Sequence, residues 1–210
     1  MGSHLNCVRM TLPNQLTILR ILLTPLFVLL FISERLVFKQ ASVVVFAVAA
    51  LTDWYDGWVA RKLGKVTRWG IFLDPLADKI LTSAAFVAFA WLGMIEVWMV
   101  WVIVVRDISI TLLRSFAELG HHTLHTNFSA KVKTFAQMVF IYAVMLAVVL
   151  SDSTSSLSPL TKVILDKNVL YFSMLVVTVL TFGTGVQYLI ENYKVIYSSL
   201  RGVNGRAESE

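Results

Sequence analysis

The chain contains two acidic segments inside otherwise apolar sequence, DWYDGWVAR at residues 53–61 and GIFLDPLAD at residues 70–78. The two aspartates of the first segment are three residues apart and those of the second are four apart, so on helices each pair shares one face. Only a short basic stretch separates the segments. We therefore predict two antiparallel neighbouring helices whose acidic faces can meet, carrying Asp53, Asp56, Asp74 and Asp78.

The composition around these segments is typical of a membrane protein. Hydrophobic residues make up 57% of the 210 positions and charged residues only 15%, against about 25% charged residues in soluble domains. The single cysteine excludes an internal disulfide. Because a bilayer core requires roughly 20 apolar residues, we predict an all-α integral membrane protein with six transmembrane helices. The apolar runs cover residues 16–32, 37–60, 70–92, 97–113, 135–150 and 169–190.

Lysine and arginine gather in alternate loops, and this sets the expected orientation. They concentrate at residues 61–68, 114–133 and 194–206, which the positive-inside bias places in the cytoplasm together with both termini. The net charge of +5 is explained by these loops, and no nucleic-acid partner is expected. We interpret residues 12–200 as one six-helix domain between two tails. Residues 1–11 are expected to be a tag remnant with an N-terminal tail, and residues 201–210 a C-terminal tail.

Four ionised carboxylates need cations if they are to lie together in an apolar environment. Two like charges 4 Å apart repel by about 4 kcal/mol at an effective dielectric constant of 20, so the group would otherwise protonate. Hard divalent ions such as Mg²⁺ prefer oxygen ligands of this kind. Two such ions about 3.5–4 Å apart can clamp a phosphoryl group during its transfer. Gly57 and Ala60 leave room for a ligand along the same helix face.

A structural alternative is that the aspartates are interfacial, or that they form ion pairs with Arg20, Arg61 and Lys79. Acidic residues inside membrane helices are functional by default. Four of them at this spacing, with small residues between them, favour a metal site.

Together the two segments match the pattern D-x-x-D-G-x-x-A-R, eight residues, G-x-x-x-D-x-x-x-D at all its fixed positions. In this the chain resembles the CDP-alcohol phosphatidyltransferases. The resemblance implies a six-helix, usually dimeric membrane enzyme with its active site near the cytoplasmic face. It implies two divalent ions, Mg²⁺ or Mn²⁺, held by Asp53, Asp56 and Asp74 with help from Asp78. It also implies that Asp78 is the catalytic base that accepts the proton of the acceptor hydroxyl.

Further stretches resemble one branch of that family, the bacterial phosphatidylglycerophosphate synthases. They lie at residues 13–25, 106–120 and 131–138, and Asp107 and Ala130 replace the glutamate and glycine usual in that branch. The implied reaction transfers the phosphatidyl group from CDP-diacylglycerol to sn-glycerol 3-phosphate and releases CMP. The implied location is the bacterial inner membrane.

The remaining candidate residues surround these segments on the predicted cytoplasmic side. For the CDP moiety, the resemblance implies Gly57, Ala60, Arg61 and Thr67. Asn14, Thr17 and Arg20, at the start of the first helix, are further candidates, with capping and anchoring as the alternative role of Asn14. For the acceptor's phosphate, the candidates are Arg106, Arg114, Lys131 and Lys133, since arginine binds phosphate with two hydrogen bonds. Membrane anchoring is the alternative role for each of these four. In the last run, Gly183 and Gly185 are candidate points of close helix contact.

Two other functions are compatible with parts of the pattern. The same chemistry could use inositol phosphate, serine or phosphatidylglycerol as the acceptor. A cation transporter or channel could use the acidic residues as its ion site, but this function leaves Gly57, Ala60 and Arg61 unexplained.

Overall fold

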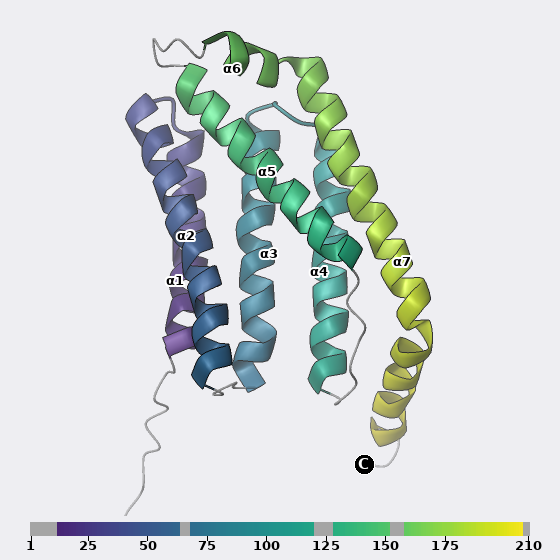
Figure 1. Cartoon of the computed structure of the whole chain (residues 1–210). Coiled ribbons are helices and arrows are strands. Elements are labelled where there is room, and N and C mark those ends of the chain that lie inside the picture. The colour runs from purple at the N-terminus through teal and green to yellow at the C-terminus, as the bar shows by residue number, and fades with distance from the viewer. Residues whose placement is uncertain (1–11, 64–67, 120–127, 152–157, 208–210) are drawn as a thin grey trace, which may run out of the picture.

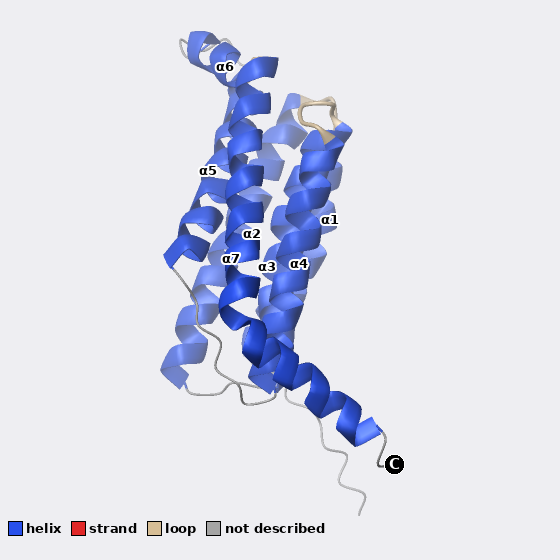
Figure 2. Cartoon of the chain, turned by 90° about the vertical axis from the view of Figure 1, so that its right-hand side faces the viewer, coloured by secondary structure: helices blue, strands red, loops and turns tan. Residues whose placement is uncertain are grey.

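The computed structural model describes the backbone of residues 12–63, 68–119, 128–151 and 158–207, and the side chains of residues 17–52, 75–115, 131–151 and 159–193. Within these residues the chain is helical throughout, with short turns and no strand, which confirms the all-α prediction (Figures 1 and 2). The helices are α1 (Leu12–Ile32), α2 (Leu36–Leu63), α3 (Arg68–Trp91), α4 (Val97–Leu119), α5 (Phe128–Ser151), α6 (Ser158–Ile164) and α7 (Lys167–Ala207).

Each of the six predicted apolar runs coincides with one of the long helices, although the third run passes the end of α3 by one residue. The differences concern helix ends. Helix α4 continues six residues past the predicted end at residue 113, and α5 begins seven residues before residue 135. These two boundaries were predicted wrongly because the added turns are rich in polar residues, yet they keep helical hydrogen bonding. The short helix α6 was not predicted. Helix α7 runs to Ala207, into the segment that we expected to be a tail.

The helices form a bundle in which α5 takes a different course from the others. Helix α1 packs against α2 and α3, α3 packs against α4, and α7 packs against both α4 and α5. Figure 1 shows α1 to α4 standing side by side, while α5 crosses them diagonally. It begins near the middle of α4 and rises to the end of the bundle where α6 lies. The first turns of α5 are therefore beside the middle of α4.

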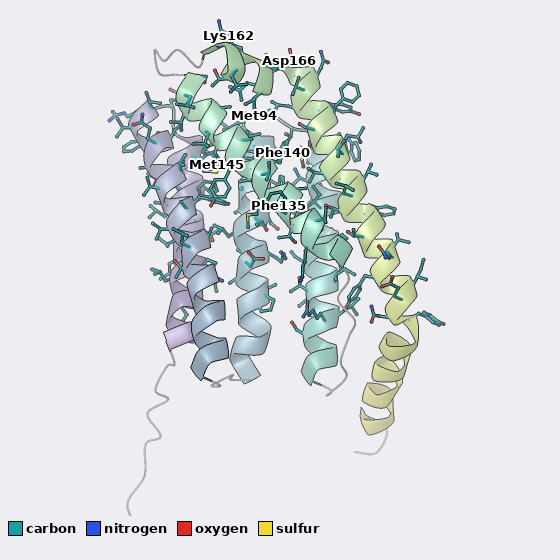
Figure 3. All side chains as sticks on the ribbon, viewed as in Figure 1. Met94, Phe135, Phe140, Met145, Lys162 and Asp166 are labelled. Carbon is teal, nitrogen blue, oxygen red and sulfur yellow. The ribbon has the colours of Figure 1, made fainter. Side chains whose placement is uncertain are left out.

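Aromatic side chains form much of the buried core. The ring centroid of Phe27 is 5.8 Å from that of Phe31 and 5.1 Å from that of Phe46, and Phe31 is 5.4 Å from Phe89. These four side chains, from α1, α2 and α3, are completely buried. Phe140 extends the cluster from α5 by an edge contact with Phe89 (Figure 3). The aromatic contacts thus join four helices.

The outer surface is apolar as well, as expected for a chain in contact with lipid. Leu29 of α1 is 72% exposed, and Phe172 and Ile190 of α7 are 63% and 72% exposed. Soluble monomers rarely expose contiguous apolar patches of large size. In the described part, α5 and α7 contain stretches long and apolar enough to cross a membrane, and α1 and α2 contain shorter ones. These features characterise a membrane protein.

We predict that Phe27→Ala lowers the free energy of unfolding by about 3–5 kcal/mol, because it leaves a cavity among buried rings. Thermal unfolding in detergent would measure this. The matched control is Leu29→Ala on the exposed face of the same helix, with an expected change below about 1 kcal/mol. Equal losses in the two variants would contradict the assignment of these two faces.

Candidate active site

The four aspartates of the acidic segments lie on two adjacent antiparallel helices, as predicted. Asp53 and Asp56 belong to α2, and Asp74 and Asp78 belong to α3. Helices α2 and α3 contact each other and both pack against α1 (Figure 1). Asp53 lies ten residues before the end of α2 and Asp78 ten residues after the start of α3. At 1.5 Å per residue, each is about 15 Å along its helix from the connected ends.

The other two aspartates also lie at similar depths. Asp56 is seven residues from the end of α2 and Asp74 six residues from the start of α3, which places both about 10 Å from the connected ends. The side chains of Asp53, Asp56 and Asp74 lie outside the described part, so no group of three metal-ligating side chains occurs among those that are described. Two carboxylate pairs at matching depths on neighbouring helices are a donor set that fits hard divalent cations.

Asp78 has a described side chain, and a lysine pairs with it. Its Oδ2 accepts a hydrogen bond from Nζ of Lys79 at 2.7 Å. The Asp78 side chain is 21% exposed, so it is accessible to a ligand. The Asp78 carboxylate therefore has a lysine partner and is still partly exposed.

A second polar group lies between α4 and α5, centred on Asp107. Its Oδ1 accepts hydrogen bonds from Nζ of Lys133 at 2.5 Å and from Nη1 of Arg106 at 3.0 Å. Its Oδ2 accepts one from Nε2 of Gln137 at 3.1 Å. We call Arg106, Asp107, Lys133 and Gln137 the Asp107 network. With two cations and one anion, the network has one surplus positive charge, and the side chains of Asp107 and Lys133 are both only 3% exposed.

Helix α7 contributes two hydroxyl groups to this network. Nε2 of Gln137 also donates to Oγ1 of Thr181 at 3.4 Å, and Nη2 of Arg106 donates to Oγ1 of Thr184 at 3.0 Å. Among the described residues, Nε of Arg106 and Oε1 of Gln137 are buried without a hydrogen-bond partner. Of these two atoms, only Nε of Arg106 is a donor. A buried group with surplus positive charge suits an anionic ligand.

The Asp107 network and the acidic pair of α3 belong to one polar region. Lys79, which pairs with Asp78, also acts electrostatically on Asp107 and on Lys133. Helix α3, which carries Asp78 and Lys79, packs against α4, which carries Asp107. The Asp78 carboxylate thus lies in the same region of the bundle as the cations of the Asp107 network.

The structure brings two of the four predicted phosphate-binding residues together. Arg106 and Lys133 converge on Asp107, whereas Arg114 and Lys131 have exposed side chains. The sequence analysis assigned no role to the other residues of this hydrogen-bonded group. Their polar character inside apolar runs could have indicated that they have buried polar partners. These residues are Asp107, Gln137, Thr181 and Thr184.

The residues predicted for the CDP moiety are described only in part. Thr17 is 2% exposed on α1. The side chains of the others, apart from Arg20, lie outside the described part. Near Thr17, the buried Arg20 donates from Nε to the backbone oxygen of Ala49 at 3.4 Å, one helical turn before Asp53. This contact connects α1 to the acidic segment of α2. The CDP residues outside the described part are Asn14, Gly57, Ala60, Arg61 and Thr67.

We predict that Asp107→Asn lowers the free energy of unfolding by about 3–5 kcal/mol, because Lys133 then remains buried without its counter-ion. Denaturant or thermal unfolding in detergent would measure this. Glu34→Gln, at an exposed acidic side chain, is the control and should change stability by less than about 0.5 kcal/mol. An unchanged unfolding midpoint for Asp107→Asn would show that the buried pair is not an ionic one.

The chain is similar in sequence to known proteins. The chain is 38% identical over 147 residues to the CDP-diacylglycerol–glycerol-3-phosphate 3-phosphatidyltransferase of Bacillus subtilis, covering 64% of this chain and 76% of that protein. It is 39% identical over 140 residues to the protein of the same name from Escherichia coli strain K12, covering 63% and 75%. A profile of the CDP-alcohol phosphatidyltransferases matches residues 10–181, a range that contains both acidic segments and the Asp107 network. On the breadth of that match, the chain belongs to the CDP-alcohol phosphatidyltransferase family.

Proposed function

We propose that the protein transfers the phosphatidyl group from CDP-diacylglycerol to sn-glycerol 3-phosphate and releases CMP. The observation that carries the proposal is the placement of a positively charged, partly unsatisfied network beside the acidic segment of α3. An acceptor with its own phosphate requires a cation site next to the catalytic carboxylate, whereas serine requires none. The two relatives named above act on glycerol 3-phosphate by name, which supports the same choice.

In the proposed reaction, Asp78 is the general base. Its carboxylate accepts the proton of a glycerol hydroxyl, whose oxygen then forms a bond to the β-phosphorus of CDP-diacylglycerol. The bond from that phosphorus to the CMP oxygen breaks, roughly in line with the attack. Lys79, whose Nζ donates a hydrogen bond to Asp78 at 2.7 Å, orients the carboxylate before the transfer.

Asp53, Asp56, Asp74 and Asp78 would hold two divalent ions, Mg²⁺ or Mn²⁺. When bound, these ions would supply charge neutralisation for the diphosphate and for the departing CMP. The residues proposed to border the CDP moiety are Asn14, Thr17, Gly57, Ala60, Arg61 and Thr67.

Arg106 and Lys133 are the proposed inner contacts of the acceptor's phosphate. Both have a hydrogen bond to Asp107, and each nitrogen that donates it carries further N–H groups for a phosphate oxygen. Arg114 and Lys131, with exposed side chains, are proposed to attract the anion at the rim. The surplus positive charge of the network favours a phosphorylated acceptor over a neutral one.

The proposed setting is the inner membrane of a bacterium. Helices α1 to α5 and α7 would cross the bilayer, with both termini and the active site on the cytoplasmic side, as a homodimer. Basic residues at the connected ends of α2 and α3 support this orientation. The acyl chains of the substrate would remain in the bilayer while its head group reaches the acidic segments.

We predict that purified protein in mixed micelles with CDP-diacylglycerol and Mg²⁺ releases CMP with glycerol 3-phosphate as the acceptor. Serine should give less than about a tenth of that rate, because it has no phosphate for the cation network to bind. Inositol phosphate and phosphatidylglycerol should also give less than about a tenth, because the two relatives are named for glycerol 3-phosphate. Faster CMP release with one of these three would assign that acceptor instead. Metal flux across sealed vesicles without CMP release would indicate a cation transporter.

We predict that Asp78→Asn lowers kcat at least about 100-fold, since an amide cannot accept the hydroxyl proton. Asp53→Asn, Asp56→Asn and Asp74→Asn should raise the Mg²⁺ concentration needed for half-maximal rate. Excess chelator should abolish activity, and added Mg²⁺ or Mn²⁺ should restore it. The control is Asp166→Asn, at the exposed start of α7 (Figure 3). Wild-type kcat in Asp78→Asn would remove Asp78 as the base.

A further inference from the structure

The side chain of Arg106 is held from two sides. Its Nη1 donates to Asp107 at 3.0 Å, and its Nη2 donates to Oγ1 of Thr184 at 3.0 Å. The hydroxyl of Thr184 is itself fixed, because it donates to the backbone oxygen of Leu180 at 2.8 Å, one turn earlier in α7. Its proton therefore faces its own helix, and a lone pair remains for Arg106.

The residue after Thr184 leaves the space that the stem of Arg106 occupies. A Cβ atom added to Gly185 would lie 2.8 Å from Nε, 2.9 Å from Cγ and 3.4 Å from Cδ of Arg106. Carbon atoms do not approach other heavy atoms this closely without displacement. Because Cγ is close to the backbone of α4, the arginine cannot avoid the contact by moving only its end. Of the residues with L side chains, none fits here with Arg106 unmoved.

The second glycine of α7 differs in this respect. A Cβ atom added to Gly183 would have no heavy atom within 4 Å among the described residues. The close contact expected from the sequence is therefore confirmed at Gly185 and absent at Gly183. Thr184 and Gly185 also lie beyond residue 181, where the match to the family profile ends. Their role is not implied by that match.

We propose that Thr184 and Gly185 are positioning residues for the acceptor subsite, and that they act through Arg106. Because Gly185 has no side chain, the aliphatic part of Arg106 can pack against α7. Thr184 accepts a hydrogen bond from one end of the guanidinium group. Asp107 fixes the other end, so the second N–H groups of Nη1 and Nη2 keep one orientation toward the acceptor's phosphate. This inference rests on the proposed function. It predicts that changes in α7 alter the affinity for the acceptor and leave that for CDP-diacylglycerol unchanged.

The test compares Gly185→Ala with Gly183→Ala, two identical changes two residues apart in one helix. Steady-state CMP release is measured in mixed micelles while glycerol 3-phosphate or CDP-diacylglycerol is varied. Gly185→Ala should raise the KM for glycerol 3-phosphate about tenfold, the effect of losing a hydrogen bond to a charged group. Its KM for CDP-diacylglycerol should stay within about twofold, and Gly183→Ala should match wild type in both constants.

Two further comparisons separate positioning from a general effect on folding. Thr184→Val removes the hydroxyl at nearly constant volume and should raise the same KM, whereas Thr184→Ser restores a hydroxyl and should recover most of the affinity. In an Arg106→Ala background, Gly185→Ala should add no more than about a twofold change, because residues that act through one another are not additive. If Gly185→Ala fails to fold, the inference is tested by comparing the KM for glycerol 3-phosphate of Thr184→Val with that of Thr184→Ser.

Wild-type KM values for glycerol 3-phosphate in both Gly185→Ala and Thr184→Val would overturn the inference. Equal increases in the KM of both substrates would overturn it as well. Failure of the proposed function would look different, because wild type itself would release no CMP with glycerol 3-phosphate. The thermal stabilisation of each protein by inorganic phosphate would then decide. Phosphate should stabilise wild type and Gly183→Ala but have little effect on Gly185→Ala. Equal stabilisation of all three proteins would overturn the inference.

Discussion

An ionised side chain between apolar helices needs a partner of opposite charge, since the desolvation of an unpaired charge costs several kcal/mol. Asp107 is the described residue on which this constraint acts most directly. It is 3% exposed and accepts hydrogen bonds from α4 and from two positions on α5. Two of the donors, Arg106 and Gln137, also donate to threonine hydroxyls of α7. Three helices must therefore keep fixed relative positions for the charges to be satisfied. The same requirement places cations beside the acidic segment of α3.

The described contacts divide the bundle into an apolar part and a polar part. The first is built on the aromatic cluster of Phe27, Phe31, Phe46 and Phe89, which joins α1, α2 and α3. The second is the Asp107 network, which links α4, α5 and α7. Helix α5 runs diagonally (Figure 1) and contributes to both parts. Lys133 in its second turn reaches Asp107, while Phe140 farther along contacts Phe89. Aromatic packing holds α1, α2 and α3 together, and the paired charges hold α4, α5 and α7 together.

Much of this architecture could be predicted from the sequence, but the helix ends and the tertiary contacts could not. Hydropathy follows the part of a helix that faces lipid, so the predicted runs stopped where polar residues such as Arg114 and Lys131 begin, although the helices continue. The regular spacing of the four aspartates predicted two helices and one acidic face on each, because that pattern is local. The partners of Arg106 could not be predicted in this way. Thr184 is 78 residues away along the chain, and only the packing of α7 on α4 brings the two together.

The pairing of Asp107 with Lys133 also bears on how such a chain enters a membrane. The two residues belong to consecutive helices, 26 positions apart, so they are synthesised within seconds of each other. The two side chains can pair before α7 has been synthesised. Early pairing would spare both side chains the desolvation cost of an unpaired charge. The later addition of α7 would then supply Thr181 and Thr184 to a network whose ion pair already exists.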